Sequence, residues 1–69
     1  MAESVYKVVE LVGKSSESWE KAAAAAIERA GESLRDLRVA EVVAQDMQIE
    51  NGKVVFYRSK VSVSFKFEG

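Results

Sequence analysis

Hydrophobic and polar residues alternate along this chain in patterns that predict a strand, a helix and a long hairpin. Residues 5–12 are rich in β-branched side chains and predict a strand, and Gly13 supplies the permissive backbone expected at its exit. The side-chain oxygen of Ser15 or Ser16 is then placed to cap the free amides of the first helical turn. The pattern therefore predicts a strand that gives way to a helix within a few residues.

The next segment carries apolar residues at the i, i+3, i+4 and i+7 spacing of one helical face. This apolar stripe consists of Trp19, Ala22, Ala23, Ala26, Ile27, Ala30 and Leu34. The opposite face is charged, and Glu17 and Lys21 stand four residues apart in the order that favours a weak surface ion pair. Because the stripe is mostly alanine, the helix can lie close to a curved sheet, and we expect it to end between Gly31 and Leu34.

The second half of the chain predicts a β-hairpin. Residues 38–49 have strand character, and residues 54–67 form the returning strand. Residues 50–53 (Glu-Asn-Gly-Lys) are expected to form the tight turn between them, because Asn and Gly both tolerate positive φ. The returning strand alternates an apolar side (Tyr57, Val61, Val63, Phe65, Phe67) with a polar side (Arg58, Lys60, Ser62, Ser64, Lys66). We expect one face to meet the helix and the other to meet water or a polar lumen.

Length and composition narrow the functional classes. The 69 residues form a single domain, 1–69, and a chain of this size buries only about 60% of the surface that its unfolded form exposes. Cysteine and histidine are absent, so disulfides and a tight zinc site are excluded and oligomerisation is the expected source of stability. The net charge of −1 without like-charged blocks argues against nucleic-acid or membrane partners, and with no signal-peptide pattern the expected location is cytoplasmic.

Taken together, these features resemble the dodecin family. The matching segments keep their order and spacing over nearly the whole chain: Val5-Tyr-Lys-Val-Val-Glu-Leu-Val-Gly13, Ala26-Ile-Glu-Arg-Ala30, Ala40-Glu-Val-Val43 and Val61-Ser-Val-Ser-Phe65. The resemblance implies an α+β fold in which a three-stranded antiparallel sheet partly wraps one helix, assembled as a hollow homododecamer. It also implies a non-catalytic protein that binds or stores a small ligand, which is a riboflavin-type flavin in many members.

The positions that would contact a flavin depart from the family pattern. Val39 stands where the resemblance places a stacking tryptophan, Arg58 stands where it places a glutamine, and Gln45 belongs to the same predicted ligand cleft. Valine offers no flat π surface, and arginine only donates hydrogen bonds and adds a charge. We therefore do not expect the usual stacked mode, and storage of riboflavin or FMN through other contacts, such as Arg58 or Phe56, is the alternative.

Three short strings resemble the calcium dodecins, a subset that lacks the tryptophan. They are Ser18-Trp-Glu20, Arg38-Val-Ala40 and Gln45-Asp-Met47. The resemblance implies calcium as the cofactor. Calcium needs roughly six to eight oxygen ligands, and because no loop of this chain supplies them, a site would have to repeat a few carboxylates across a symmetry axis.

The carboxylates proposed for calcium are Glu41, Asp46 and Glu50, and an ordinary solvated or ion-paired role is the alternative for each. Glu41 is expected to share its strand face with apolar residues, namely Val39, Val43, Met47 and Ile49. A carboxylate on such a face needs a partner, and we expect Arg58 or Lys60 of the neighbouring strand to provide it.

Basic residues on the last strand suggest a second kind of ligand. Arg58, Lys60 and Lys66 share one face, and a symmetric ring of such cations would hold the phosphate groups of FMN or coenzyme A, with a solvated polar face as the alternative. Catalysis is not expected, because there is no histidine or cysteine and no carboxylate, tyrosine or lysine pair is marked by its spacing. A small enzyme subunit with a site at a symmetry interface is the least favoured hypothesis.

Overall fold

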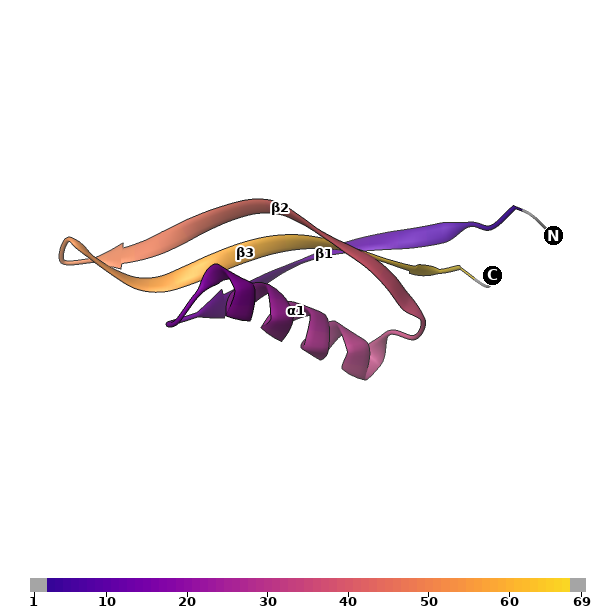
Figure 1. Cartoon of the computed structure of the whole chain (residues 1–69), viewed down its shortest axis with the longest axis horizontal. Coiled ribbons are helices and arrows are strands. Elements are labelled where there is room, and N and C mark those ends of the chain that lie inside the picture. The colour runs from indigo at the N-terminus through magenta and orange to yellow at the C-terminus, as the bar shows by residue number, and fades with distance from the viewer. Residues whose placement is uncertain (1–2, 68–69) are drawn as a thin grey trace.

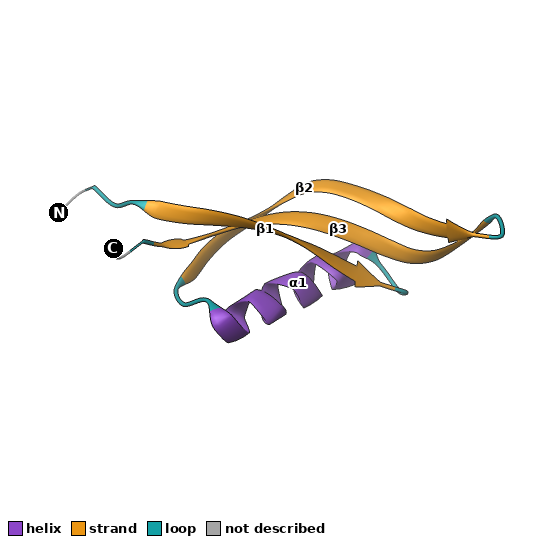
Figure 2. Ribbon diagram, turned by 180° about the vertical axis from the view of Figure 1, so that it is seen from behind, coloured by secondary structure: helices purple, strands orange, loops and turns teal. Residues whose placement is uncertain are grey.

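The computed structural model describes residues 3–67 and has the predicted β-α-β-β order. Strand β1 (Tyr6–Ser15) is followed by helix α1 (Trp19–Ser33) and by the hairpin of β2 (Leu37–Glu50) and β3 (Lys53–Lys66). The sheet is antiparallel with the order β1-β3-β2, so the last strand lies in the centre. Helix α1 packs on one face of the sheet and leaves the other face open (Figures 1 and 2). The predicted α+β architecture is confirmed.

Alternation along the central strand assigns side chains to the two faces of the sheet. Ser59, Val61 and Val63 are buried beneath α1, and we call this side the helix face. The open face carries the intervening residues of β3: Arg58, Lys60, Ser62, Ser64 and Lys66. Because directly paired residues of antiparallel strands point to the same side, the register of β3 sets the two faces of β1 and β2 as well.

The N-cap of the helix lies two to three residues later than the predicted Ser15 or Ser16. The hydroxyl of Ser18 accepts the amide of Lys21 at 3.0 Å, which makes Ser18 the N-cap. Ser15, one of the two predicted caps, instead accepts the amides of Glu17 at 3.0 Å and Ser18 at 3.5 Å and orders the connection before the helix. The predicted helix end is confirmed, since α1 stops at Ser33 and the Leu34 amide donates to the Ala30 carbonyl.

Gly13 does not terminate the first strand, contrary to the prediction. Strand β1 continues through it to Ser15, and Gly13 is buried opposite Ser59. A Cβ atom at this position would overlap the main-chain carbonyl oxygen of Ala22 and would lie 3.1 Å from the Cβ of Ala26. Glycine is therefore required because the helix approaches the strand closely, and not because the strand ends there.

The hairpin turn follows the sequence prediction. Asn51 has a φ of 53° and Gly52 a φ of 76°, and both residues lie between the paired Glu50 and Lys53. Two consecutive positive φ values are the signature of the tight turn that the Asn-Gly pair favours.

The core of the single chain is small and the molecule is elongated. The predicted helical stripe is confirmed, but its buried members are only Ala22, Ala26 and Ala30, and of these Ala26 belongs to the core cluster with Val61 and Val63. The strands extend beyond both ends of α1 (Figure 1), and the molecule measures 54 × 20 × 16 Å. Its accessible surface is 5277 Å², whereas a folded monomer of 7.6 kDa exposes about 4,300 Å². Much apolar surface is thus left uncovered by the chain's own helix.

Among the described residues, no helix is long and apolar enough to cross a membrane.

Candidate functional site

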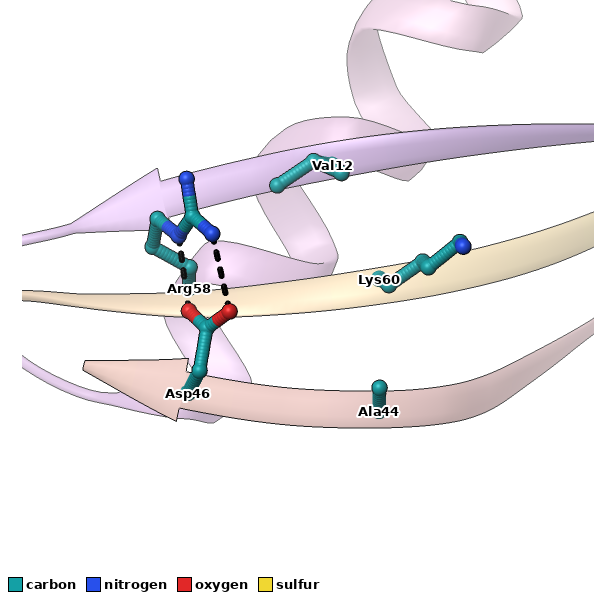
Figure 3. Close-up of a pocket in the computed structure, with 5 residues that line it drawn as sticks. All are labelled: Val12, Ala44, Asp46, Arg58 and Lys60. Carbon is teal, nitrogen blue, oxygen red and sulfur yellow. Dashed lines mark hydrogen bonds and ion pairs between the residues drawn. The ribbon is translucent and has the colours of Figure 1, made fainter. Parts of the chain in front are cut away.

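A shallow hollow of about 290 Å³ lies on the open face of the sheet (Figure 3). It is lined by Val12 of β1, Ala44 and Asp46 of β2, and Arg58 and Lys60 of β3. The register explains this grouping, because Val12, Lys60 and Ala44 form one row across the three strands, and Lys14, Arg58 and Asp46 form the next. We call this place the open-face hollow.

Asp46 and Arg58 form a two-pronged ion pair across β2 and β3. Arg58 donates from Nε to Oδ1 at 2.7 Å and from Nη2 to Oδ2 at 2.8 Å, which is the parallel fork that arginine makes with carboxylates (Figure 3). The Arg58 side chain is 45% exposed and the Asp46 side chain is 56% exposed, so solvent screens their attraction. The main effect of the ion pair is to fix both groups in place.

The fork also changes the titration of its members. The hydrogen bond from Arg58 lowers the pKa of Asp46 below the ordinary 3.8, and the same bond raises the pKa of Arg58. A depressed carboxyl pKa means that the pair is fully formed above the ordinary value and is lost only as the pH falls through the lowered one. At neutral pH the open-face hollow therefore holds a closed ion pair.

Two further cations near the hollow also have partners within the chain. Lys60 Nζ lies 3.4 Å from Oε1 of Glu10, and Lys14 Nζ lies 4.3 Å from the centre of the Phe56 ring. Together with Arg58, three cations from β1 and β3 thus gather on one part of the open face, and each is engaged by a group of the same chain.

Behind the hollow, the start of α1 holds the backbone of β2 in place. The indole Nε1 of Trp19 donates to the main-chain oxygen of Asp46 at 3.1 Å, and the ring meets Tyr57 edge-on with centroids 5.0 Å apart. Ser59 donates its hydroxyl to the Trp19 carbonyl at 2.9 Å. Trp19 is a packing residue, as expected from the helical stripe. The role of Ser59 was missed, although a serine on the apolar side of an alternating strand is itself a signal of a buried polar contact.

The predicted surroundings of Glu41 are confirmed for Val39, which pairs with Ser64 on the same open face, and are wrong for Met47. A register shift between Val42 and Ala44 places one extra residue in β2 and reverses the two faces beyond it. Glu41 pairs with Ser62 on the open face, whereas Met47 pairs with Tyr57 on the helix face. The expected ion pair is wrong as well, because Arg58 is bound by Asp46 and Lys60 by Glu10.

The three residues of the predicted ligand cleft do not meet within one chain. Arg58 lies in the open-face hollow, whereas Val39 lies beside Ser64, six residues or about 20 Å farther along β3. Gln45 pairs with Ser59 and therefore lies on the helix face. Val39 instead borders a second, smaller hollow of about 160 Å³ beside Ile27 and Leu37. A cleft that contains all three residues would need more than one copy of the chain, and it stays a prediction.

The carboxylates proposed for calcium are also separated. Asp46 is held by Arg58, Glu50 accepts a hydrogen bond from Gln48 at 3.2 Å, and Glu41 lies beside Ser62. Within residues 3–67, no three acidic, histidine or cysteine side chains come together in a way that would hold a metal ion. A calcium site built from these residues would have to combine several chains.

The cations proposed for phosphate binding do share the open face, as the alternation predicts. Arg58 and Lys60 are neighbours in the hollow, but Lys66 pairs with Tyr6 at the far end of β3. Within one chain, the hollow therefore brings together two of the three.

Comparison with known proteins decides the family. The model of the dodecin family matches residues 5–68, which is nearly the whole chain. The chain belongs to the dodecin family. Among curated dodecins, calcium dodecin of Mycobacterium tuberculosis is 51% identical over 63 residues, and the match covers 91% of this chain and 89% of that protein.

Solved dodecins share the fold. The dodecin of Streptomyces coelicolor superposes with a TM-score of 0.92 at 33% identity and covers 100% of this chain and 99% of its own. The crystal structure of the M. tuberculosis calcium dodecin, described as calcium chelating with a novel calcium-binding site, superposes with a TM-score of 0.83 at 52% identity, covering 94% and 93%. The resemblance drawn from the sequence is confirmed for the family and the fold.

Proposed function

We infer that this dodecin is a non-catalytic binding protein that assembles as a homododecamer and takes up calcium. The observation that carries the proposal is the 51% identity to a calcium dodecin over 91% of the chain. Identity at this level extends over every strand and the helix, so it covers the surfaces from which a shared site would be built.

The shape of the single chain supports assembly. Dodecins are homo-oligomers, and the chain exposes large apolar side chains on both faces of its sheet, including Val8, Val39, Val42 and Met47. Helix α1 spans about 22 Å at 1.5 Å per residue, whereas strands β2 and β3 span nearly 50 Å each. The helix of one chain cannot cover such a sheet, and other copies of the chain are the partners proposed to do so.

The separation of the acidic side chains is consistent with a calcium site shared between copies. Calcium binds roughly six to eight hard oxygen atoms and tolerates irregular geometry, so one or two carboxylates per chain suffice when several chains meet. Glu41, Asp46 and Glu50 remain the proposed contributors. Catalysis has no comparable support, because the hydrogen bonds of serine hydroxyls among the described residues all join main-chain atoms and none joins a carboxylate or a lysine.

Calcium is expected to stabilise the native oligomer. A ligand that binds only the folded state at about 100 times its dissociation constant adds about 2.7 kcal/mol to the free energy of unfolding. We therefore expect millimolar calcium to raise the melting temperature of the purified protein by several degrees, and a chelator to reverse the rise. Differential scanning fluorimetry of Trp19 measures this directly.

Magnesium at the same concentration is the control, since it demands a smaller octahedral cage and should raise the melting temperature much less. Equal melting temperatures in calcium and in chelator would refute calcium as the ligand.

A further inference from the structure

We propose that Asp46 is a specificity-determining residue whose carboxylate occupies the anion-binding position of the open-face hollow and keeps it closed to phosphate groups. The inference names a ligand class that the hollow does not admit. It shares Asp46 with the calcium proposal, so its test is made without calcium. It rests on the placement of three cations, the geometry of one ion pair and the anchoring of one backbone segment.

The first observation is the gathering of positive charge. Lys14, Arg58 and Lys60 come from adjacent rows of β1 and β3 on the same side of the sheet. Arg58 and Lys60 line the hollow, and its apolar part is formed by Val12 and Ala44. Cations that converge on a partly apolar hollow are the elements from which proteins build phosphate sites. With a volume of about 290 Å³, the hollow has room for a phosphate group.

The second observation is the orientation of the Arg58 guanidinium. Its Nε and Nη2 atoms donate in parallel to the two carboxylate oxygens of Asp46, at 2.7 and 2.8 Å. Arginine presents the same two donors to two oxygens of a phosphate. The carboxylate therefore stands where a phosphate bound by this fork would stand.

The third observation is that Asp46 is anchored. Its main-chain oxygen accepts the indole N–H of Trp19, and Trp19 begins the helix. The carboxylate is consequently presented to Arg58 from a fixed backbone. An incoming phosphate would have to break two charge-assisted hydrogen bonds and would then lie beside a displaced carboxylate of the same sign, so we expect the native hollow to bind phosphate weakly.

The test is a gain of binding in the variant Asp46→Ala. Removing the carboxylate frees both donors of Arg58 and raises the local charge by one. We expect inorganic phosphate to bind this variant at least about tenfold more tightly than it binds the native protein, a change that one charge-assisted hydrogen bond accounts for. Isothermal titration calorimetry measures the affinity, and the fluorescence of Trp19 reports on the same site.

Glu32→Ala is the matched control. It removes the same charge from an exposed ion pair with Arg29 on α1, at 3.7 Å, outside the hollow. We expect no gain in this control, and we expect the gain to disappear when Asp46→Ala is combined with Arg58→Gln.

Equal phosphate affinity in the native protein and Asp46→Ala, or an equal gain in Glu32→Ala, would overturn the inference. If Asp46→Ala does not assemble, Asp46→Asn removes the charge with less change of shape and is held to the same criterion. Because Asp46 is also a proposed calcium contributor, the phosphate titrations are made in the presence of a chelator, and calcium is titrated in a separate experiment. A failure of the calcium proposal therefore leaves this test intact.

Discussion

Gly13→Ala is expected to prevent this chain from folding to its native state. The added methyl group would occupy the position of the main-chain carbonyl oxygen of Ala22, which is a rigid part of the first helical turn. The helix can make room only by moving away from β1, and this would separate Ala22 and Ala26 from the sheet. Such overpacking costs about 3 kcal/mol or more, a large share of the roughly 3 to 10 kcal/mol that stabilises a domain of this size. Urea unfolding followed by circular dichroism measures the loss.

Gly31→Ala is the matched control for this substitution. Gly31 lies in the last turns of α1, and a Cβ there meets only the Cδ1 atom of Leu37 at an ordinary 3.8 Å. Because alanine is the better helix former, this variant should gain about 0.5–1 kcal/mol. If both variants unfolded at the same urea concentration as the native protein, the close packing of α1 on β1 would be disproved.

The double substitution Val42→Glu and Met47→Glu is expected to abolish assembly. These residues pair with Val61 and Tyr57 and so lie on the helix face of the sheet. Helix α1 nevertheless leaves Val42 48% exposed and Met47 45% exposed. If neighbouring chains cover them, two buried charges without partners would cost several kcal/mol at every copy of the interface. Size-exclusion chromatography with light scattering should show small or unfolded species in place of the native oligomer.

Ala24→Glu with Ala25→Glu is the charge-matched control, because both alanines lie exposed on α1 and glutamate is a good helix former. It should keep the native mass. A native mass for the Val42 and Met47 variant as well would show that this part of β2 does not face another chain.

Periodicity was sufficient to predict the elements, the buried stripe of the helix and the two faces of β3, because the core of this fold is formed by one helical stripe and one alternating strand. It could not reveal the reason for Gly13, which depends on how closely two elements approach in space. The glycine at position 13 correctly indicated a special position. It did not show which kind, because glycine is favoured both where a strand ends and where two elements pack closely.

Strand register explains why the central ion pair was missed. If the hairpin were regular from Glu50 and Lys53 onward, Asp46 would lie opposite Tyr57. The register shift between Gln48 and Ile49 moves it opposite Arg58 and creates the fork. A bulge depends on how both strands pack. Counting residues outward from the hairpin turn could therefore predict neither the Asp46–Arg58 ion pair nor the exchange of faces at Val42. Sites that combine several chains leave still less trace in the spacing of one sequence.

Native mass spectrometry of the purified protein, with and without added calcium, tests the proposed assembly and ligand in one experiment. We expect twelve times the subunit mass of 7.6 kDa, with calcium-sized increments that disappear in chelator. A monomer or dimer would contradict the proposed assembly. A twelve-subunit particle that carries flavin-sized increments and takes up no calcium would contradict the proposed ligand.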